Sequence, residues 1–171
     1  MAVRGLFFLL AALLTFGSAA AQEKISGTAA GLDEDSIAIQ GNRIRLWGID
    51  APEMAQTCTR GGKPWFCGRD AARALDRLVA GKTVTCLVIV RDQLRRVVVG
   101  DCTLGGQSLS RWMVSNGWAA VNRQQTEVYV KEEDEARAAR RNIWSSQFEM
   151  PWDYKIRQRL KGQPPSPPVA E

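Results

Sequence analysis

The stretch RLWGIDAPE, residues 45–53, runs from an apolar strand-like segment into a carboxylate, a proline and a second carboxylate. In a flat strand the side chains of Arg45 and Asp50 point to opposite faces, because five is an odd separation. They can serve one site only where the strand bends, and Gly48 is the residue that permits a bulge there. We therefore expect Arg45 and Asp50 to meet across a bend at Gly48.

The residues after Asp50 add oxygen ligands to the same small volume. Pro52 biases Ala51 toward an extended conformation, which leaves the Ala51 carbonyl able to face an ion. Glu53 follows on the loop just past the strand and supplies a second carboxylate. Taken alone, the stretch fits equally well an edge charge at Arg45 followed by an ordinary polar turn.

The chain of 171 residues contains no histidine. This excludes Ser-His-Asp and Cys-His catalysis and H-E-x-x-H zinc sites. Any hydrolytic chemistry must then use carboxylates, arginines and a hard metal ion bound by oxygen. The net charge of +5 favours an anionic partner such as nucleic acid only mildly.

The first residues are typical of a secretory signal. Arg4 precedes an apolar run at residues 6–16, and the segment 1–21 ends with Ala19 and Ala21 at A-x-A spacing. We expect cleavage after Ala21, export to the periplasm or full secretion, and no stable membrane insertion afterwards. A retained membrane anchor is the alternative, although the run is shorter than the ~20 residues of a spanning helix.

The length fits one domain, which we place at residues 22–155. Residues 156–171 end in GQPPSPPVAE and form a Pro-rich tail that we expect to be disordered. We expect the mature protein to be a monomer.

Cysteines at four positions suit two disulfides in an exported chain. Of the three pairings we favour Cys58 with Cys67, which closes a short loop. Cys86 would then pair with Cys102, because each lies in a strand-like run and neighbouring strands can bring them together. A zinc site is rejected, since there is no C-x-x-C spacing and no histidine.

Hydrophobic patterning predicts five strands and three helices. The strands are residues 24–32, 35–39, 42–49, 83–90 and 95–104, and the helices are 68–82, 107–117 and 130–144. The first helix has an arginine-rich outer face and stops at Gly81. In the third helix the acids lead and the arginines trail, which suits the helix macrodipole, so we interpret its acidic run as helix chemistry rather than a metal site.

Four motifs in this order resemble the staphylococcal nuclease family, the secreted thermonucleases. They are DEDS (33–36), RLWGIDAPE (45–53), DQLRR (92–96) and ARRNIW (139–144). The second is the most specific, and the resemblance extends over residues 25–144. It implies an α+β fold, a five-stranded OB-fold β-barrel with three α-helices, in agreement with the patterning.

The resemblance also implies a role for each matching residue. The metal ligands are Asp35, Asp50 and the Ala51 backbone carbonyl, and the catalytic residues are Arg45, Glu53 and Arg96. One calcium ion suits such oxygen ligands, and the planar fork of arginine suits a phosphate. Glu53 would act as the general base toward the attacking water.

Two of the motifs depart from the family pattern. Glu34 stands where a glycine commonly separates the two aspartates of the first motif, which brings an extra carboxylate near the ion. In the third motif Leu94 and Arg95 replace the usual Tyr-Gly, and Arg95 is an alternative to Arg96 as the phosphate ligand.

The nucleotide pocket differs as well. Arg123 and Gln125 stand near the place where the staphylococcal enzyme has tyrosines, so base stacking there is expected to be lost. Arg95, Arg123 and Trp65, the last in the loop between two cysteines, are candidate substrate contacts.

These residues lead to two functional hypotheses. The first is an exported calcium-dependent endonuclease that hydrolyses phosphodiester bonds of DNA, with RNA as a further candidate substrate. The alternative is a non-catalytic OB-fold envelope protein that binds nucleic acid or acidic polysaccharide, as in exopolysaccharide-related proteins. An acidic cluster that faces a polyanion favours the enzyme over a pure binder.

Overall fold

The computed structural model describes residues 22–94 and 97–162. The expected signal at 1–21, Arg95, Arg96 and the end of the expected tail, 163–171, lie outside the described residues. Among the described residues, no helix combines the length and the apolar character that crossing a bilayer requires.

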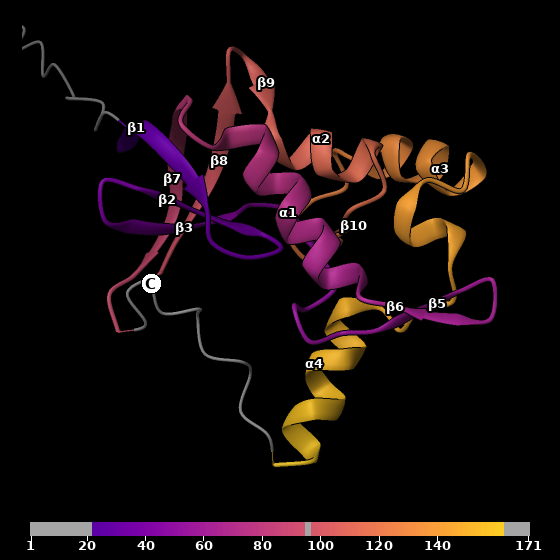
Figure 1. Ribbon diagram of the computed structural model, residues 1–171. Coiled ribbons are helices and arrows are strands. Elements are labelled where there is room, and N and C mark those ends of the chain that lie inside the picture. Colours follow the sequence, from indigo (N-terminus) through magenta and orange to yellow (C-terminus); the bar gives the residue numbers. More distant parts are fainter. Residues whose placement is uncertain (1–21, 95–96, 163–171) are drawn as a thin grey trace, which may run out of the picture.

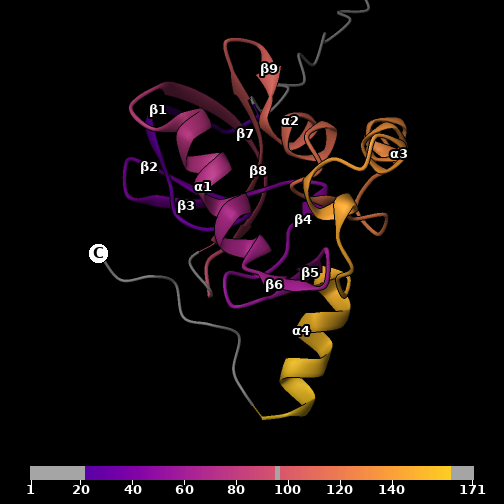
Figure 2. The ribbon, with the colours of Figure 1, turned by 45° about the vertical axis from the view of Figure 1, so that its right-hand side comes forward.

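A closed barrel of five strands forms one side of the described chain (Figures 1 and 2). Its strands are β1 (Lys24–Gly31), β2 (Ser36–Ile39), β3 (Asn42–Leu46), β7 (Thr83–Asp92) and β8 (Val97–Leu104). Four of the pairings are antiparallel, and a parallel pairing of β3 with β8 closes the barrel. The predicted α+β fold with a five-stranded barrel is confirmed.

Five two- or three-residue strands complete the sheets. They are β4 (Ile49–Asp50), β5 (Cys58–Arg60), β6 (Lys63–Trp65), β9 (Gln107–Ser108) and β10 (Ala120–Val121). β4 leaves the barrel and pairs with β10, whereas β5 and β6 form a separate hairpin. β9 follows β8 after a turn and pairs with its end in antiparallel fashion.

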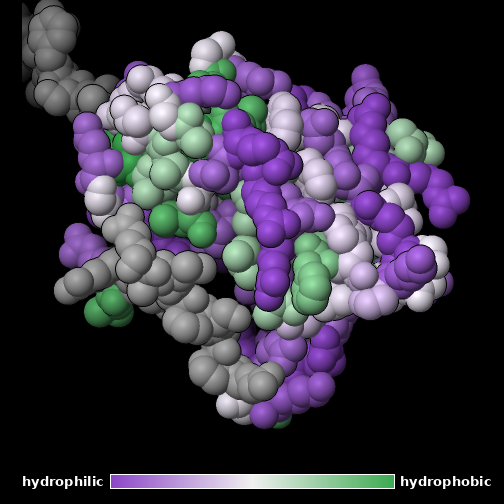
Figure 3. All heavy atoms as spheres, in the orientation of Figure 1, coloured by the Kyte–Doolittle hydropathy of each residue, from purple (hydrophilic) through white to green (hydrophobic). Residues whose placement is uncertain are grey.

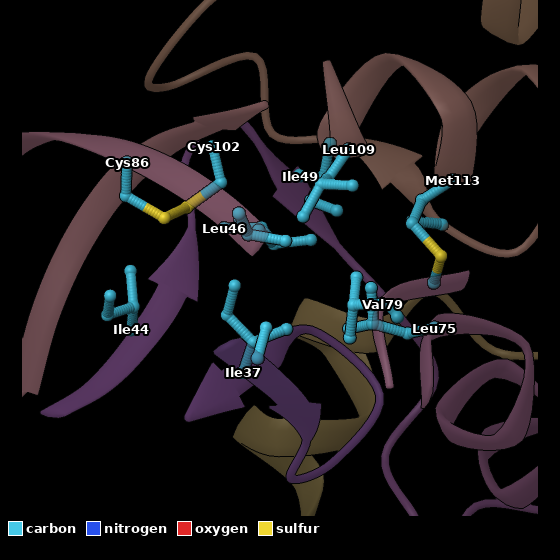
Figure 4. Close-up of a cluster of buried hydrophobic side chains, with 14 of the residues drawn as sticks. Ile37, Ile44, Leu46, Ile49, Leu75, Val79, Cys86, Cys102, Leu109 and Met113 are labelled. Atoms are coloured by element: carbon cyan, nitrogen blue, oxygen red, sulfur yellow. A yellow bond between two sulfur atoms is a disulfide. The ribbon is translucent and has the colours of Figure 1, made fainter. Parts of the chain in front are cut away.

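The hydrophobic core lies between the barrel and the helices (Figure 4). Alternate strand residues such as Ile37, Ile44 and Leu46 point inward and are almost fully buried, as the period of two requires. Leu75 of helix α1 (Cys67–Val79) and Met113 of helix α2 (Leu109–Ser115) belong to the same core and lie on its helical side.

Both predicted disulfides are confirmed. Cys86 and Cys102 lie directly opposite each other on β7 and β8, with their Cα atoms 4.0 Å apart. Cys58 and Cys67 close the β5–β6 hairpin against the start of α1, with a Cα separation of 5.8 Å. Among the described residues no cysteine is free.

The described residues contain four α-helices, one more than expected. They are α1 (Cys67–Val79), α2 (Leu109–Ser115), α3 (Val130–Ala138) and α4 (Pro151–Leu160), with a 3-10 turn η1 (Asn142–Ser145) between the last two. The outer face of α1 is exposed and carries Arg69, Arg73 and Arg77, and Figure 3 shows a hydrophilic band there. Gly81 follows α1 with φ +73°, as its predicted role as the helix stop requires.

The third helix is shorter than predicted, since it ends at Ala138 rather than at residue 144. Arg140 and Asn142 adopt positive φ values of 50° and 42°, which breaks the helix. The turn is fixed by tertiary contacts: Arg141 Nη1 donates to the Ser115 carbonyl, and Asn142 Nδ2 donates to that of Asn116, each at 2.7 Å.

Helix α4 was not predicted, and residues 156–160, which the sequence assigned to the tail, form its second half. Pro151 occupies its first turn, where the missing N–H of proline causes no loss. Glu149 precedes the helix and pairs with Arg157, whose Nη2 lies 2.7 Å from Glu149 Oε2.

Candidate functional site

The site begins where the chain leaves the barrel between β3 and β4. Gly48 takes φ +81°, and a Cβ atom there would lie 2.6 Å from Thr126 Cγ2, so both conformation and space require glycine. β3 therefore ends at Leu46, and Asp50 pairs with Ala120 of β10. The predicted bend at Gly48 is confirmed, as a turn between two strands.

The bend brings Arg45 between two buried carboxylates. Arg45 Nε lies 3.0 Å from Asp35 Oδ2, and Arg45 Nη2 lies 3.5 Å from Asp50 Oδ1. Asp35 and Asp50 are each 4% exposed. The charge of Asp35, more than that of Asp50, raises the pKa of Arg45 further, so its guanidinium is a permanent cation.

A lysine that the sequence analysis did not single out completes this arrangement. Lys155 of α4 places its Nζ atom 2.6 Å from Asp50 Oδ1 and 3.0 Å from Glu53 Oε1. Burial lowers the pKa of Lys155, but the charges of Asp50 and Asp35 outweigh burial and raise it. For Asp50 burial outweighs the charge of Lys155, and its pKa is raised. Asp35, Arg45, Asp50, Lys155 and Glu53 thus form a continuous alternation of acids and bases, which we call the acidic centre.

The turn between β1 and β2 adds further carboxylates. Oxygen atoms of Asp33, Glu34 and Asp35 lie within 4.8 Å of one another. Asp33 pairs with Arg43 and also accepts the Asp35 N–H at 3.2 Å. Burial, followed by the charges of Asp35 and Asp33, raises the pKa of Glu34 to about 9. At neutral pH Glu34 is therefore protonated and adds no negative charge to the turn.

The chemistry of these donors fits a hard divalent cation. Asp35, Asp50 and the backbone of Ala51 offer oxygen only, which is the ligand type that calcium takes. Ala51 is fully buried and the two aspartates nearly so, which makes them a rigid ligand set. The two aspartates come from separate segments, the β1–β2 turn and strand β4, and Arg45 pairs with both of them.

The loop that carries Glu53 is held by Gln56, a second residue not anticipated from the sequence. Gln56 is 1% exposed, and its Oε1 accepts the Glu53 N–H at 3.2 Å. Its Nε2 donates to the carbonyl of Glu149 at 2.6 Å. One buried amide therefore fixes both the base candidate and the segment that leads into α4.

Helix α1 packs against the same loop without a side chain between them. A Cβ atom on Gly68 would lie 1.9 Å from the Glu53 carbonyl oxygen and 2.6 Å from that of Pro52. Glycine at this position lets the backbone of α1 support the loop directly.

The other candidate contacts lie outside the acidic centre. Arg123 Nη2 lies 2.7 Å from Oε2 of Glu133, a fully buried glutamate of α3 that also accepts the Val121 N–H. The interpretation of the α3 acids as structural agrees with this role of Glu133. Trp65 is half-buried in the β5–β6 hairpin, where Arg60 stacks on its ring 3.5 Å from the centroid.

A hollow of about 230 Å³ lies between the segment after β10 and helix α4. Its lining residues are Val121, Asn122, Arg123, Gln124, Trp152 and Ile156. The sequence predicts that aromatic stacking is lost near Arg123, yet α4 supplies Trp152 to this place. Arg95 and Arg96, the two candidate phosphate ligands of the β7–β8 hairpin, lie outside the described residues.

Residues 43–146 match the family of staphylococcal nuclease homologues, and the chain belongs to this family. It is 36% identical over 146 residues to the succinoglycan biosynthesis protein ExoI of Rhizobium meliloti (strain 1021), a match that covers 82% of this chain and 75% of the relative. It is 33% identical to an uncharacterized endonuclease of Escherichia coli, over 74% of this chain and 81% of that one. A rice protein (Oryza sativa subsp. japonica), named a probable staphylococcal-like nuclease, CAN3, is 34% identical, but only 32% of its length is covered.

Proposed function

We propose that the protein is an exported, calcium-dependent endonuclease that hydrolyses phosphodiester bonds of DNA, with RNA as a second candidate substrate. The acidic centre carries this proposal, because it gathers Asp35, Arg45, Asp50 and Glu53 within a family that includes named nucleases. Two disulfides and the N-terminal sequence pattern support export.

Each residue has a task that its chemistry suits. The guanidinium of Arg45 can bind two phosphate oxygens and offset the negative charge that repels the attacking water. Arg96 of the β7–β8 hairpin is proposed as the second phosphate ligand. The carboxylate of Glu53 accepts the proton of that water, which contributes roughly 10² to 10⁴ in rate.

Asp35, Asp50 and the Ala51 carbonyl would hold the calcium ion. When bound there, the ion supplies Lewis-acid stabilisation of the charge that builds on the phosphate in the transition state. The oxygen-only donors and their deep burial support this assignment.

Cleavage of single-stranded DNA by the purified mature protein tests the proposal. We expect cleavage with calcium and none with excess EDTA. Glu53→Gln should lower kcat by roughly 10² to 10⁴, because it removes the proton acceptor but keeps the side-chain shape. Glu135→Gln, which changes an exposed glutamate of α3, should leave kcat unaltered.

Two results would count against the proposal in different ways. Intact DNA after incubation with calcium at high protein concentration would reject the nuclease. Undiminished cleavage by Glu53→Gln would reject only the role of Glu53.

A second function is favoured by one relative, since a succinoglycan biosynthesis protein is 36% identical over three quarters of its own length. The alternative is a non-catalytic envelope protein whose barrel binds nucleic acid or acidic polysaccharide. Retention of the protein on an immobilised acidic exopolysaccharide, together with intact DNA in the cleavage assay, would favour this alternative.

A further inference from the structure

Lys155 reaches the acidic centre from a helix that lies beyond the region matched by the family, which ends at residue 146. Its ammonium contacts Asp50 Oδ1 at 2.6 Å and Glu53 Oε1 at 3.0 Å. These oxygens belong to a proposed metal ligand and to the proposed general base. The lysine therefore contacts two carboxylates to which the proposed function gives other partners, the metal ion for Asp50 and the attacking water for Glu53.

The net charge of the acidic centre depends on whether the Lys155 ammonium is present. The acidic centre contains three carboxylates and two basic side chains, so its net charge is −1 when all five groups are ionised. Without the ammonium the net charge would be −2, which is what one divalent cation neutralises. An ammonium and a divalent ion that share one carboxylate oxygen also repel each other in a site shielded from water. Lysine and ion are thus alternative partners of Asp50.

The side chain of Lys155 has properties that would allow it to be displaced from Asp50. This side chain is 19% exposed, whereas that of Asp50 is 6% exposed, so the lysine is the more accessible member of the pair. A lysine is a compact charge on a flexible four-carbon stem, which can swing into water without moving the helix.

We propose that Lys155 is an internal competitor of the divalent ion: its ammonium occupies Asp50 and Glu53, and binding of the ion at Asp50 displaces it. This inference rests on the metal centre of the proposed function. Its consequence is that Lys155 sets the ion concentration at which the centre fills, and frees the Glu53 carboxylate only when the ion is present.

Calorimetric titration of the mature protein with calcium alone, at low ionic strength and without substrate, tests the competition. Lys155→Met, which removes the charge but keeps the chain length, should bind calcium at least about tenfold more tightly than the wild type. The matched control is Lys161→Met, which removes the same charge from the exposed end of α4. Its calcium affinity should stay within about twofold of the wild type.

A thermal melt of the same three proteins gives a second readout. In EDTA, Lys155→Met should melt below the wild type, because the buried Asp50 and the half-buried Glu53 each lose an ion-pair partner. In saturating calcium this difference should shrink. Should Lys155→Met fold only with calcium, ion-induced folding followed by far-UV circular dichroism would support the inference, and Lys155→Gln provides a second uncharged variant for the titration.

The outcomes separate this inference from the proposed function. Equal calcium affinity in all three proteins, or weaker binding by Lys155→Met, overturns the competition and leaves the metal centre standing. Absence of calcium binding in all three overturns both.

Discussion

Asp101 lies on β8 opposite Leu87 of β7, with its Oδ1 atom shielded from solvent. Within the part of the chain that the structure describes, this oxygen has no hydrogen-bond partner. Burial raises the pKa of Asp101 above its ordinary value of 3.8. Stability from this group is therefore fully present below pH 3.8 and is lost as the pH rises through the folded-state pKa.

We expect Asp101→Asn to raise the free energy of unfolding at pH 7, because the amide carries no charge to desolvate. The gain should be below about 1 kcal/mol, since the carboxyl is partly solvated. Urea unfolding at pH 7 and at pH 3.5 measures it, and the gain should vanish at the lower pH. A gain of equal size at both pH values would show that ionisation of Asp101 is not its cause. Asp134→Asn, on the exposed face of α3, is the control.

Gly68 allows a test of how closely the Glu53 loop must be held. In Gly68→Ala the new methyl group would overlap the Glu53 carbonyl, at 1.9 Å, so the loop or the start of α1 must shift. Because a misplacement of about 1 Å can cost roughly 10²-fold in rate, we expect a large fall in kcat from protein that is still folded.

The matched control is Gly61→Ala, at a glycine with φ +56° and open space around it. This variant should lose about 1 kcal/mol of stability through backbone strain and keep its kcat. Equal kcat values for the two variants would show that the contact between α1 and the loop does not position Glu53.

At the scale of elements, α4 presents one face to the site. Trp152, Lys155 and Ile156 are three and four residues apart, so they lie on the same side of the helix. Lys155 enters the acidic centre, and the other two line the adjacent hollow. The hollow therefore lies beside the acidic centre, and we propose it as the place for the base of a bound nucleotide.

We expect Trp152→Ala to raise KM for single-stranded DNA roughly tenfold or more, with a smaller change in kcat, because base stacking on an aromatic ring contributes about 1 to 3 kcal/mol. Trp152→Phe should restore most of the affinity. Leu160→Ala, at an 83% exposed position of the same helix, is the control. A fall in kcat at unchanged KM would contradict a substrate contact.

The elements that the sequence predicts well are those with a local signal. The barrel strands show alternating apolar residues, and α1 shows an apolar face and a glycine at its end. Each of these patterns can be recognised within the segment itself. The end of the third helix has no such signal, because the contacts of Arg141 and Asn142 with the end of α2 decide it. α4 carries little apolar periodicity and is fixed instead by Gln56 and Lys155, through partners far away in the chain.

At the scale of the molecule, the closing of the barrel creates the site. The parallel pairing of β3 with β8 fixes the end of β3, and Gly48 then turns the chain out of the barrel with Arg45 on one side and Asp50 on the other. The motif at residues 45–53 contains that turn, which is why its residues could be anticipated. Lys155 could not be, because it is separated from Asp50 by 105 positions.

The family match ends at residue 146, whereas α4 begins at Pro151. A chain trimmed to the matched boundary would lose Lys155 and the Glu149 anchor of Gln56 in a single cut. Such a fragment would keep the motif at residues 45–53, yet it would lack two contacts that hold Glu53 and its loop, and we expect its affinity for calcium to differ from that of the longer chain. The family match and the set of residues that contact the acidic centre therefore end at different places in the chain.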